Sequence, residues 1–435
     1  MDTYKVKPIF LKPDNNFHLQ TRVPGSKSIT NRALLLAALC PGTVTLTDVL
    51  FSDDSRHFIQ CLKDLGFELT ADEQTRRIVI RGCGGKLPRQ SAFIDVGSAG
   101  TAARFLTAML GLAPGTWHLT ASEQMKKRPM APLLESLTRL GCTISYEEKP
   151  GFFPFTIHSS GISASRISID IGQSSQFLSA LLMSAVLLDH DFTIDVQGSH
   201  GFSYILMTLK MMEQFGIHVE QLGRRTFRIP GNARAGASSY AIEPDLSAAA
   251  YFYSMAALSG GEVQVPGVFS TSMQGDLAFL GCLRDMGCSC RQDPQGIVVK
   301  GPAGGKLKGL ASADLSAFSD QALTLAAIAP FADTPTTIRG IGHIRLQECD
   351  RIHAIVSNLA LMSIRTEQAA EDEITIFPGS PSPARIRTYD DHRVAMAFSL
   401  PGLRAPGIVI ENPLCCRKTF EDYFTILSRI TGGEG

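Results

Sequence analysis

Three side chains near the N-terminus have the chemistry of an anion site. Lys27, Ser28 and Arg32 follow Pro24-Gly25 and open a run rich in alanine and leucine. This pattern predicts a buried helix whose first turn displays the three side chains. Unpaired N–H groups and the positive end of the helix dipole lie there, which suits a phosphate or a carboxylate. An ordinary capped helix with solvated charges explains the same residues, and the upstream glycine of a Walker loop is missing.

The same design returns along the chain. Counted from Ser26, the starts follow at intervals of 72, 76, 71, 75 and 71 residues, at Ser98, Ser174, Asp245, Asp320 and Asp391. Each start precedes an alanine- and leucine-rich segment, so a chain of 435 residues holds about six such units. Repeats of this length are folding units of several elements rather than solenoid repeats. We therefore expect six buried helices whose polar starts converge.

Further polar clusters accompany these starts. Glycines at 97 and 100 would let a ligand approach the backbone, and Arg104 and Arg128 add charge nearby. Carboxylates at helix starts are most often caps, and we interpret Asp53 and Asp54 as a cap rather than as catalysts. The clusters in the second half of the chain are Asp320, Glu348 to Arg351, Asp391 to Arg393, and Arg417 with Lys418.

Composition excludes several classes of protein. Forty-one basic and forty-one acidic residues give no net attraction to nucleic acid or membrane. The longest apolar stretch, residues 177–188, is too short to span a bilayer, and no signal peptide is recognisable, so we expect a cytoplasmic protein. The ten cysteines lack the spacing of a zinc site and predict free thiols. We expect no metal.

The order of elements indicates an α/β protein. Short β-rich segments such as residues 44–47, 77–81 and 118–120 alternate with the predicted helices, and glycine and proline mark most of the joins. The fourth repeat opens near Glu243, almost halfway along the chain. We place the boundary between two lobes there.

Eight segments resemble the signature segments of the 5-enolpyruvylshikimate-3-phosphate synthase family, in that family's order. They cover residues 23–424 and are Pro24-Gly-Ser-Lys-Ser, Gly97-Ser-Ala-Gly-Thr-Ala, Lys127-Arg-Pro, Ser174-Ser-Gln-Phe-Leu-Ser-Ala-Leu-Leu, Ser272-Met-Gln-Gly-Asp, Glu348-Cys-Asp-Arg, Tyr389-Asp-Asp-His-Arg and Lys418-Thr-Phe-Glu-Asp-Tyr-Phe. Because the segments are many and collinear, the resemblance is specific.

The resemblance implies a two-lobed enolpyruvyl transferase fold. It has six βαβαββ repeats, three per lobe, with inward helices and an active site in the interlobe cleft. The first lobe would be residues 24–243, and the second would be residues 1–23 with 244–435. The implied reaction moves the enolpyruvyl (carboxyvinyl) group of phosphoenolpyruvate to the 5-hydroxyl of shikimate 3-phosphate. It passes through a tetrahedral intermediate, releases phosphate and belongs to the shikimate pathway to chorismate and the aromatic amino acids.

The resemblance also implies roles for individual residues. Asp320 would be the base, Glu348 and Lys27 would carry protons, and Lys418 would be a donor to the phosphate. Residues that would bind shikimate 3-phosphate are Lys27, Ser28, Arg32, Ser174, Ser175, Gln176, Tyr204, Asp320, His343 and Gln347. Residues that would bind phosphoenolpyruvate are Lys27, Gly100, Arg128, Gln176, Arg351, Arg393 and Lys418. The implied chemistry needs no cofactor, and the implied partners are the two small-molecule substrates. Glyphosate would occupy the phosphoenolpyruvate site. We expect the protein to be a monomer.

The chain departs from the family pattern at several positions. Ser98 and Phe105 replace an asparagine and a proline, His343 and Gln347 replace an asparagine and a lysine, and residues 198–204 differ from the usual Ser-Lys-Pro-Tyr.

Two other functions stay open. A sister enzyme that uses UDP-N-acetylglucosamine would carry Lys-Asn-Ala at Lys27-Ser28 and would lack the Glu348 to Arg351 cluster. A non-catalytic anion-binding paralogue is the second alternative, and the presence of both Asp320 and Glu348 argues against it.

Overall fold

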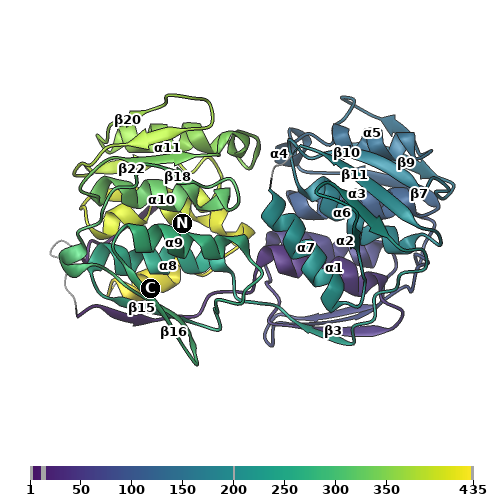
Figure 1. Ribbon diagram of the computed structural model, residues 1–435, viewed down its shortest axis with the longest axis horizontal. Coiled ribbons are helices and arrows are strands. Elements are labelled where there is room, and N and C mark those ends of the chain that lie inside the picture. Colours follow the sequence, from purple (N-terminus) through teal and green to yellow (C-terminus); the bar gives the residue numbers. More distant parts are fainter. Residues whose placement is uncertain (1–2, 11–15, 199–200, 433–435) are drawn as a thin grey trace. The chain divides into compact units, whose positions relative to one another are not determined.

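The computed structural model describes residues 3–10, 16–198 and 201–432. The chain divides into two compact units (Figure 1). The first unit consists of residues 1–24 and 243–435, and the second unit consists of residues 25–242. Each unit is built from small mixed sheets and helices, as expected for the α/β class.

The second unit contains three four-stranded sheets. In one sheet the strand order is β14 (Ser239–Ala241), β3 (Thr43–Thr47), β5 (Arg77–Arg81) and β4 (Leu69–Asp72). In another the order is β6 (Ser91–Asp95), β7 (Gly115–Thr120), β9 (Phe155–Ser159) and β8 (Thr143–Tyr146). In the remaining sheet the order is β10 (Arg166–Asp170), β11 (Phe192–Gln197), β13 (Thr226–Ile229) and β12 (Glu220–Gln221). In each sheet the first pair is parallel and the other pairs are antiparallel. The helices are α1 (Lys27–Leu39), α2 (Asp53–Asp64), α3 (Gly100–Leu112), α4 (Glu123–Lys126), α5 (Ala131–Arg139), α6 (Gln176–Ser184) and α7 (Phe202–Gln214).

The first unit repeats this design with segments from both ends of the chain. In one of its sheets the strand order is β16 (Ser289–Asp293), β17 (Gly296–Lys300), β15 (Glu262–Pro266) and β2 (His18–Gln20). In another the order is β18 (Ala313–Asp314), β19 (Thr336–Arg339), β21 (Ile374–Ile376) and β20 (Thr366–Glu367). A three-stranded sheet has the order β1 (Thr3–Lys5), β23 (Ile408–Glu411) and β22 (Ala384–Ile386). The helices are α8 (Leu246–Ser259), α9 (Phe279–Asp285), α10 (Ala322–Ile328), α11 (Arg351–Leu361), α12 (His392–Ala397) and α13 (Tyr423–Ile430).

The βαβαββ order is complete in three repeats and is shared between distant segments in the others. Strand β14 comes from the end of the second unit and pairs with β3, near its beginning. In the first unit, β2 pairs with β15, and β1 pairs with β23. In these three sheets, one strand therefore comes from a segment far away in the sequence: β1 or β2 from near the N-terminus, or β14 from near the boundary between the units.

Six buried helices lie at the positions that the repeat predicted. Helices α1, α3, α6, α8 and α12 begin within two residues of Ser26, Ser98, Ser174, Asp245 and Asp391, and α10 directly follows the 3-10 turn η4 (Ser319–Gln321). Every residue of α3, α8, α10 and α12 is buried. Helices without a polar face must be covered on all sides, which explains why alanine and leucine replace the usual amphipathic pattern.

The outer helices do show that pattern. In α2 and α5, apolar side chains on one face are buried while the charged side chains, with the exception of Asp54 in α2, are at least partly exposed. All ten cysteines are free. Among the described residues, no helix is both long enough and apolar enough to cross a bilayer.

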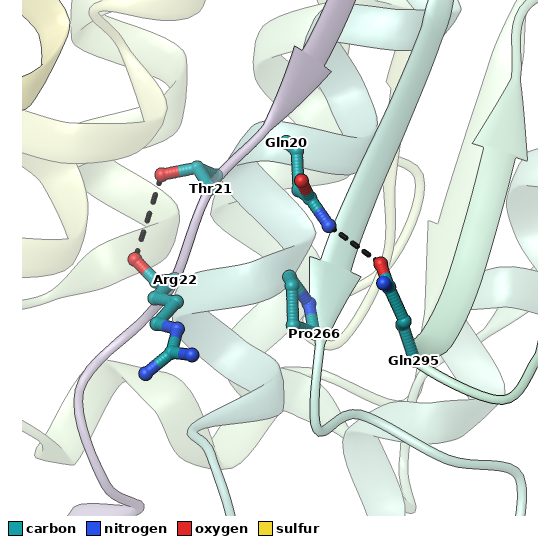
Figure 2. Close-up of a pocket in the computed structure, with 5 residues that line it drawn as sticks. All are labelled: Gln20, Thr21, Arg22, Pro266 and Gln295. Atoms are coloured by element: carbon teal, nitrogen blue, oxygen red, sulfur yellow. Dashed lines mark hydrogen bonds between the residues drawn. The ribbon is translucent and has the colours of Figure 1, made fainter.

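A pocket of about 410 Å³ lies in the first unit beside the edge strand β2 (Figure 2). Gln20, Thr21, Arg22, Pro266 and Gln295 line it, and Figure 2 shows the hydrogen bond between the two glutamine side chains. None of the predicted site residues is among these lining residues.

Candidate functional site

Lys27 opens α1 and forms an ion pair with a buried aspartate. Its Nζ lies 3.4 Å from Oδ2 of Asp54, which is 1% exposed. The interpretation of Asp53 and Asp54 as a helix cap is wrong, because Ser52 is the N-cap residue of α2 and its N–H donates to Ser55 Oγ at 2.9 Å. Asp54 instead holds the amino group of Lys27.

Arg32 lies one turn further along α1 and is 2% exposed. Its guanidinium donates to Thr208 Oγ1, Ser179 Oγ and the carbonyl oxygens of Ser28 and Tyr204, at 2.8 to 3.4 Å. All of these acceptors are neutral. Burial lowers the pKa of Arg32 to about 10, because a charge in this environment has lost its water.

Gly100 begins α3 and lies against two arginines. A Cβ atom at this position would stand 2.5 Å from Arg128 Nη1 and 2.9 Å from Arg104 Nη1. Arg104 also donates to the carbonyl oxygens of Gly100 and Pro129, at 3.1 and 3.3 Å. Two residues predicted to bind phosphoenolpyruvate, Gly100 and Arg128, are thus in contact, and Arg104 joins them.

The start of α6 brings neutral polar groups together. Ser175 is the N-cap residue, and Ser174 Oγ accepts from the N–H of Gln176 at 3.2 Å. Oε1 of Gln176 is buried without a hydrogen-bond partner among the described residues. A Cβ atom at Gly201 would lie 2.6 Å from Ser175 Oγ, so the start of α7 packs on this serine. These donors and acceptors could bind a ligand that carries hydroxyl or phosphate groups.

Tyr204 follows in α7, within the segment that departs from the family pattern. Its carbonyl oxygen accepts from Arg32 Nη2 at 3.3 Å and from Thr208 Oγ1 at 2.9 Å. Residues 199 and 200 of that segment lie outside the described residues.

The first unit gathers its charges around Arg351, which begins α11 and is 1% exposed. Nε donates to Asp391 Oδ2 at 2.8 Å, Nη1 to Asp320 Oδ1 at 2.8 Å, and Nη2 to Glu348 Oε2 at 2.9 Å. Burial alone would lower the pKa of Arg351, but the charges of Asp391, Glu348 and Asp320 raise it above its ordinary value. One guanidinium therefore fixes three carboxylates.

The other predicted residues of this unit surround that cluster. Arg393 Nη2 lies 2.9 Å from Asp320 Oδ2, and Lys418 Nζ lies 3.5 Å from Glu348 Oε1. His343 Nε2 is 2.7 Å from Ser319 Oγ, beside Asp320, and Gln347 Oε1 accepts from Arg351 Nη1. The predicted residues of the first unit are thus brought together.

Three buried aspartates have more contacts than the sequence indicated. Asp54 holds Lys27, and Asp391 holds Arg351 through both of its oxygens while it caps α12. Asp276 accepts from Ser247 Oγ and Gln321 Nε2. Asp391 was visible as a helix start in the sequence, but nothing in its spacing indicated its partner. Within the described ranges, no three histidine, cysteine, aspartate or glutamate side chains are placed so that they could hold a metal ion together.

The comparisons with known proteins are consistent along the chain. The family model described as EPSP synthase (3-phosphoshikimate 1-carboxyvinyltransferase) matches residues 12–427. The 3-phosphoshikimate 1-carboxyvinyltransferase of Nostoc punctiforme is 42% identical over 426 residues and covers 98% of each chain. The 3-phosphoshikimate 1-carboxyvinyltransferase 2 of Halalkalibacterium halodurans is 39% identical over 412 residues, which are 94% of this chain and 91% of the relative.

Solved structures share the fold. An EPSP synthase from Acinetobacter baumannii superposes with a TM-score of 0.79 at 24% identity, over 99% of this chain and 98% of that one. The enolpyruvyl transferase NikO from Streptomyces tendae gives a TM-score of 0.74 at 16% identity, with the same coverage. At these identities the likeness concerns the fold, and it matches the enolpyruvyl transferase architecture that the resemblance implied.

Proposed function

Because this chain belongs to the EPSP synthase family, we propose that residues of both units bind the two substrates of that family's reaction. The protein is a transferase that moves the enolpyruvyl group of phosphoenolpyruvate to shikimate 3-phosphate in the shikimate pathway. The names of its relatives favour this reaction over transfer to UDP-N-acetylglucosamine and over a non-catalytic paralogue.

The observation that carries the assignment of residues is the environment of Arg32. A buried charge is costly unless it is paired, and the described partners of Arg32 are all neutral. An anionic group of shikimate 3-phosphate would supply a negative charge. Ser28, Ser174, Ser175, Gln176 and Tyr204 would surround the same ligand with neutral donors and acceptors.

Phosphoenolpyruvate is the second ligand. In the second unit, Arg128 against Gly100 offers a guanidinium whose planar fork suits a carboxylate or a phosphate. In the first unit, Arg351, Arg393 and Lys418 would meet the same molecule, although each already faces a carboxylate. Lys27 and Gln176 would serve both ligands.

Two of the carboxylates that Arg351 holds, those of Asp320 and Glu348, would carry out the proton transfers. Asp320 would accept the proton of the attacking 5-hydroxyl while Glu348 delivers a proton to the methylene carbon of phosphoenolpyruvate. The adduct then loses phosphate and a proton to form the product. Lys27 would carry protons with Glu348, and Lys418, whose Nζ lies 3.5 Å from Glu348 Oε1, would donate to the phosphate.

A phosphate-release assay tests the proposal directly. Phosphate should appear only when phosphoenolpyruvate and shikimate 3-phosphate are both present, and UDP-N-acetylglucosamine should not replace the latter. Arg32→Lys is the matched variant, because it keeps a positive charge but loses the guanidinium fork. Release with UDP-N-acetylglucosamine, or full activity without Arg32, would contradict the proposal.

Three finer features belong to the same proposal. The protein would act as a monomer in the cytoplasm, where its ten free cysteines would stay reduced. His343 and Gln347 would reach shikimate 3-phosphate from the first unit. Glyphosate would compete with phosphoenolpyruvate at the residues around Gly100.

A further inference from the structure

Asp276 is a buried carboxyl to which the proposed reaction gives no role. It lies in the 3-10 turn η2 (Gly275–Ala278) and is 5% exposed. Its Oδ1 accepts from Ser247 Oγ at 2.8 Å and from Gln321 Nε2 at 2.7 Å. Ser247 lies in the first turn of α8, and Gln321 directly follows Asp320. Asp276 therefore connects α8 to the turn that carries the proposed base.

The charges that act on Asp276 come from neighbouring elements. Asp320 in η4 repels its carboxylate and Arg393 in α12 attracts it, while α8 presents the neutral Ser247. Asp245 also lies at the start of α8, but its carboxylate accepts from the N–H groups of Ser247 and Ala248. Burial, followed by the charge of Asp320, raises the pKa of Asp276 to about 6.

This interaction matters because both carboxylate oxygens of Asp320 contact arginines. Arg351 and Arg393 each contact one of its oxygens, at 2.8 and 2.9 Å. Two guanidinium groups stabilise a carboxylate and so make it a weaker base. The repulsion between Asp276 and Asp320 is reciprocal, so an ionised Asp276 opposes the arginines and favours proton uptake by Asp320.

We propose that Asp276 is a positioning residue that anchors the turn of Asp320 and keeps Asp320 basic enough to accept a proton from the substrate hydroxyl. This role rests on the proposed function of Asp320 as the base. The proton moves from the hydroxyl to Asp320, and no bond is made or broken at Asp276. Its contribution is a fixed negative charge and an oxygen that holds Gln321.

Asp276→Asn separates these two contributions, because the amide keeps an acceptor oxygen and loses the charge. We expect kcat near pH 7.5 to fall about 10-fold and the acid limb of the kcat–pH profile to move to lower pH, while both KM values stay within about twofold. Asp314→Asn is the control, since that carboxylate accepts from the N–H of Ser316 at 2.9 Å and should leave the profile unchanged. An unmoved acid limb in Asp276→Asn would overturn the proposal, whatever happens to kcat.

Ser247→Ala tests the same idea in the opposite direction. Because only ionised Asp276 supports Asp320, the acid limb of the parent protein includes the titration of Asp276. The variant keeps the carboxyl, but the loss of one donor favours its protonated form, so the acid limb should move to higher pH. A purely structural role would not give opposite shifts in the two variants, and shifts in the same direction would overturn the proposal.

Asp320→Asn is measured alongside these variants. Near-normal turnover in that variant would remove the base itself and hence the proposed function of Asp320. A failure of the proposed function is thereby distinguished from a failure of the role of Asp276, which would leave Asp320→Asn impaired.

A stability measurement guards against misfolding of Asp276→Asn. Since the folded-state pKa of Asp276 is raised from 3.8 to about 6, its favourable contribution is present below about pH 4 and lost as the pH rises through about 6. The variant should therefore unfold at the same or a higher temperature than the parent protein at pH 7.5. A lower unfolding temperature would contradict the buried, repelled carboxylate on which the proposal stands.

Discussion

Each of the two units buries an arginine in the first two turns of a helix, but the partners of the two charges differ in kind. Arg32 in the second unit contacts hydroxyl and carbonyl oxygens, and burial lowers its pKa to about 10. Arg351 in the first unit contacts three carboxylates, which raise its pKa. Both side chains are at most 2% exposed, so the difference comes from their partners and not from their depth.

This contrast indicates a division of labour. A cation with neutral partners has a charge that an anionic ligand can still satisfy. A cation that already has three carboxylates also holds those carboxylates in place, and the proposed function has Asp320 and Glu348 exchange protons with a substrate there. Under the proposed function, the second unit would offer an anionic substrate a cation whose protein partners are neutral, and the first unit would supply the carboxylates for proton transfer beside its own phosphoenolpyruvate-binding cations.

Stability should show the largest difference between the two arginines. Arg351→Met leaves the buried carboxylate of Asp391 and the part-buried carboxylates of Asp320 and Glu348 without their common partner, and the loss of one partner of a buried pair costs about 3–5 kcal/mol. Arg32→Met removes a charge that burial disfavours and should cost at least about 2 kcal/mol less. Urea unfolding at pH 7.5 measures both. Equal losses in the two variants would remove the contrast.

Turnover should depend most on the carboxylates of the first unit. Asp320→Asn and Glu348→Gln should each lower kcat by about 10²-fold or more and leave substrate binding largely intact, because they remove proton transfer but keep the size of the side chain. Steady-state kinetics with calorimetric binding controls would check this. Near-normal turnover in either variant would exclude that residue from the proton transfers.

A smaller effect is expected at Gly100 in the second unit. The added methyl group of Gly100→Ala would meet the ends of Arg128 and Arg104, which are flexible and can shift. We expect KM for phosphoenolpyruvate and the inhibition constant of glyphosate to rise several-fold (on the order of 1 kcal/mol), with little change for shikimate 3-phosphate. Inhibition by glyphosate that does not respond to phosphoenolpyruvate would contradict a shared site.

Gln347 should give the smallest effect, and here the structure revises the expectation from sequence. A lysine in the family pattern predicts that Gln347→Lys would tighten the binding of shikimate 3-phosphate. Gln347 Oε1, however, accepts from Arg351 Nη1, and lysine would replace an acceptor by a second cation. We therefore expect KM for shikimate 3-phosphate to stay constant or to rise up to about threefold. A several-fold decrease would support the argument from sequence instead.

More of the fold than of the contacts within the site could be predicted from the sequence. Helices without a polar face, recurring at nearly constant intervals, indicate six buried helices because composition and spacing are local properties of the chain. The pairing of Lys27 with Asp54, or of Arg351 with Asp391, depends on how separate helices pack. For that reason the local pattern around Asp54 suggests a cap and does not reveal its partner.

The completion of the sheets shows the same limit. Strand β14 pairs with β3 across almost two hundred residues, and β1 pairs with β23 from the opposite end of the chain. Strands β14 and β1 are each only three residues long, so their own patterns are too short to identify a partner. Which strand completes a sheet depends on segments far apart in the chain, whereas a helix start can be recognised within a single segment.

Calorimetric titration of shikimate 3-phosphate into the parent protein, Arg32→Lys and Arg32→Met tests the assignment of Arg32 most directly. If the buried guanidinium awaits an anion, the dissociation constant should rise about 10-fold or more in Arg32→Lys and about 100-fold or more in Arg32→Met, as expected for the loss of charge-assisted hydrogen bonds. Binding to Arg32→Met with the affinity of the parent protein would show that the charge of Arg32 serves the fold and not the ligand.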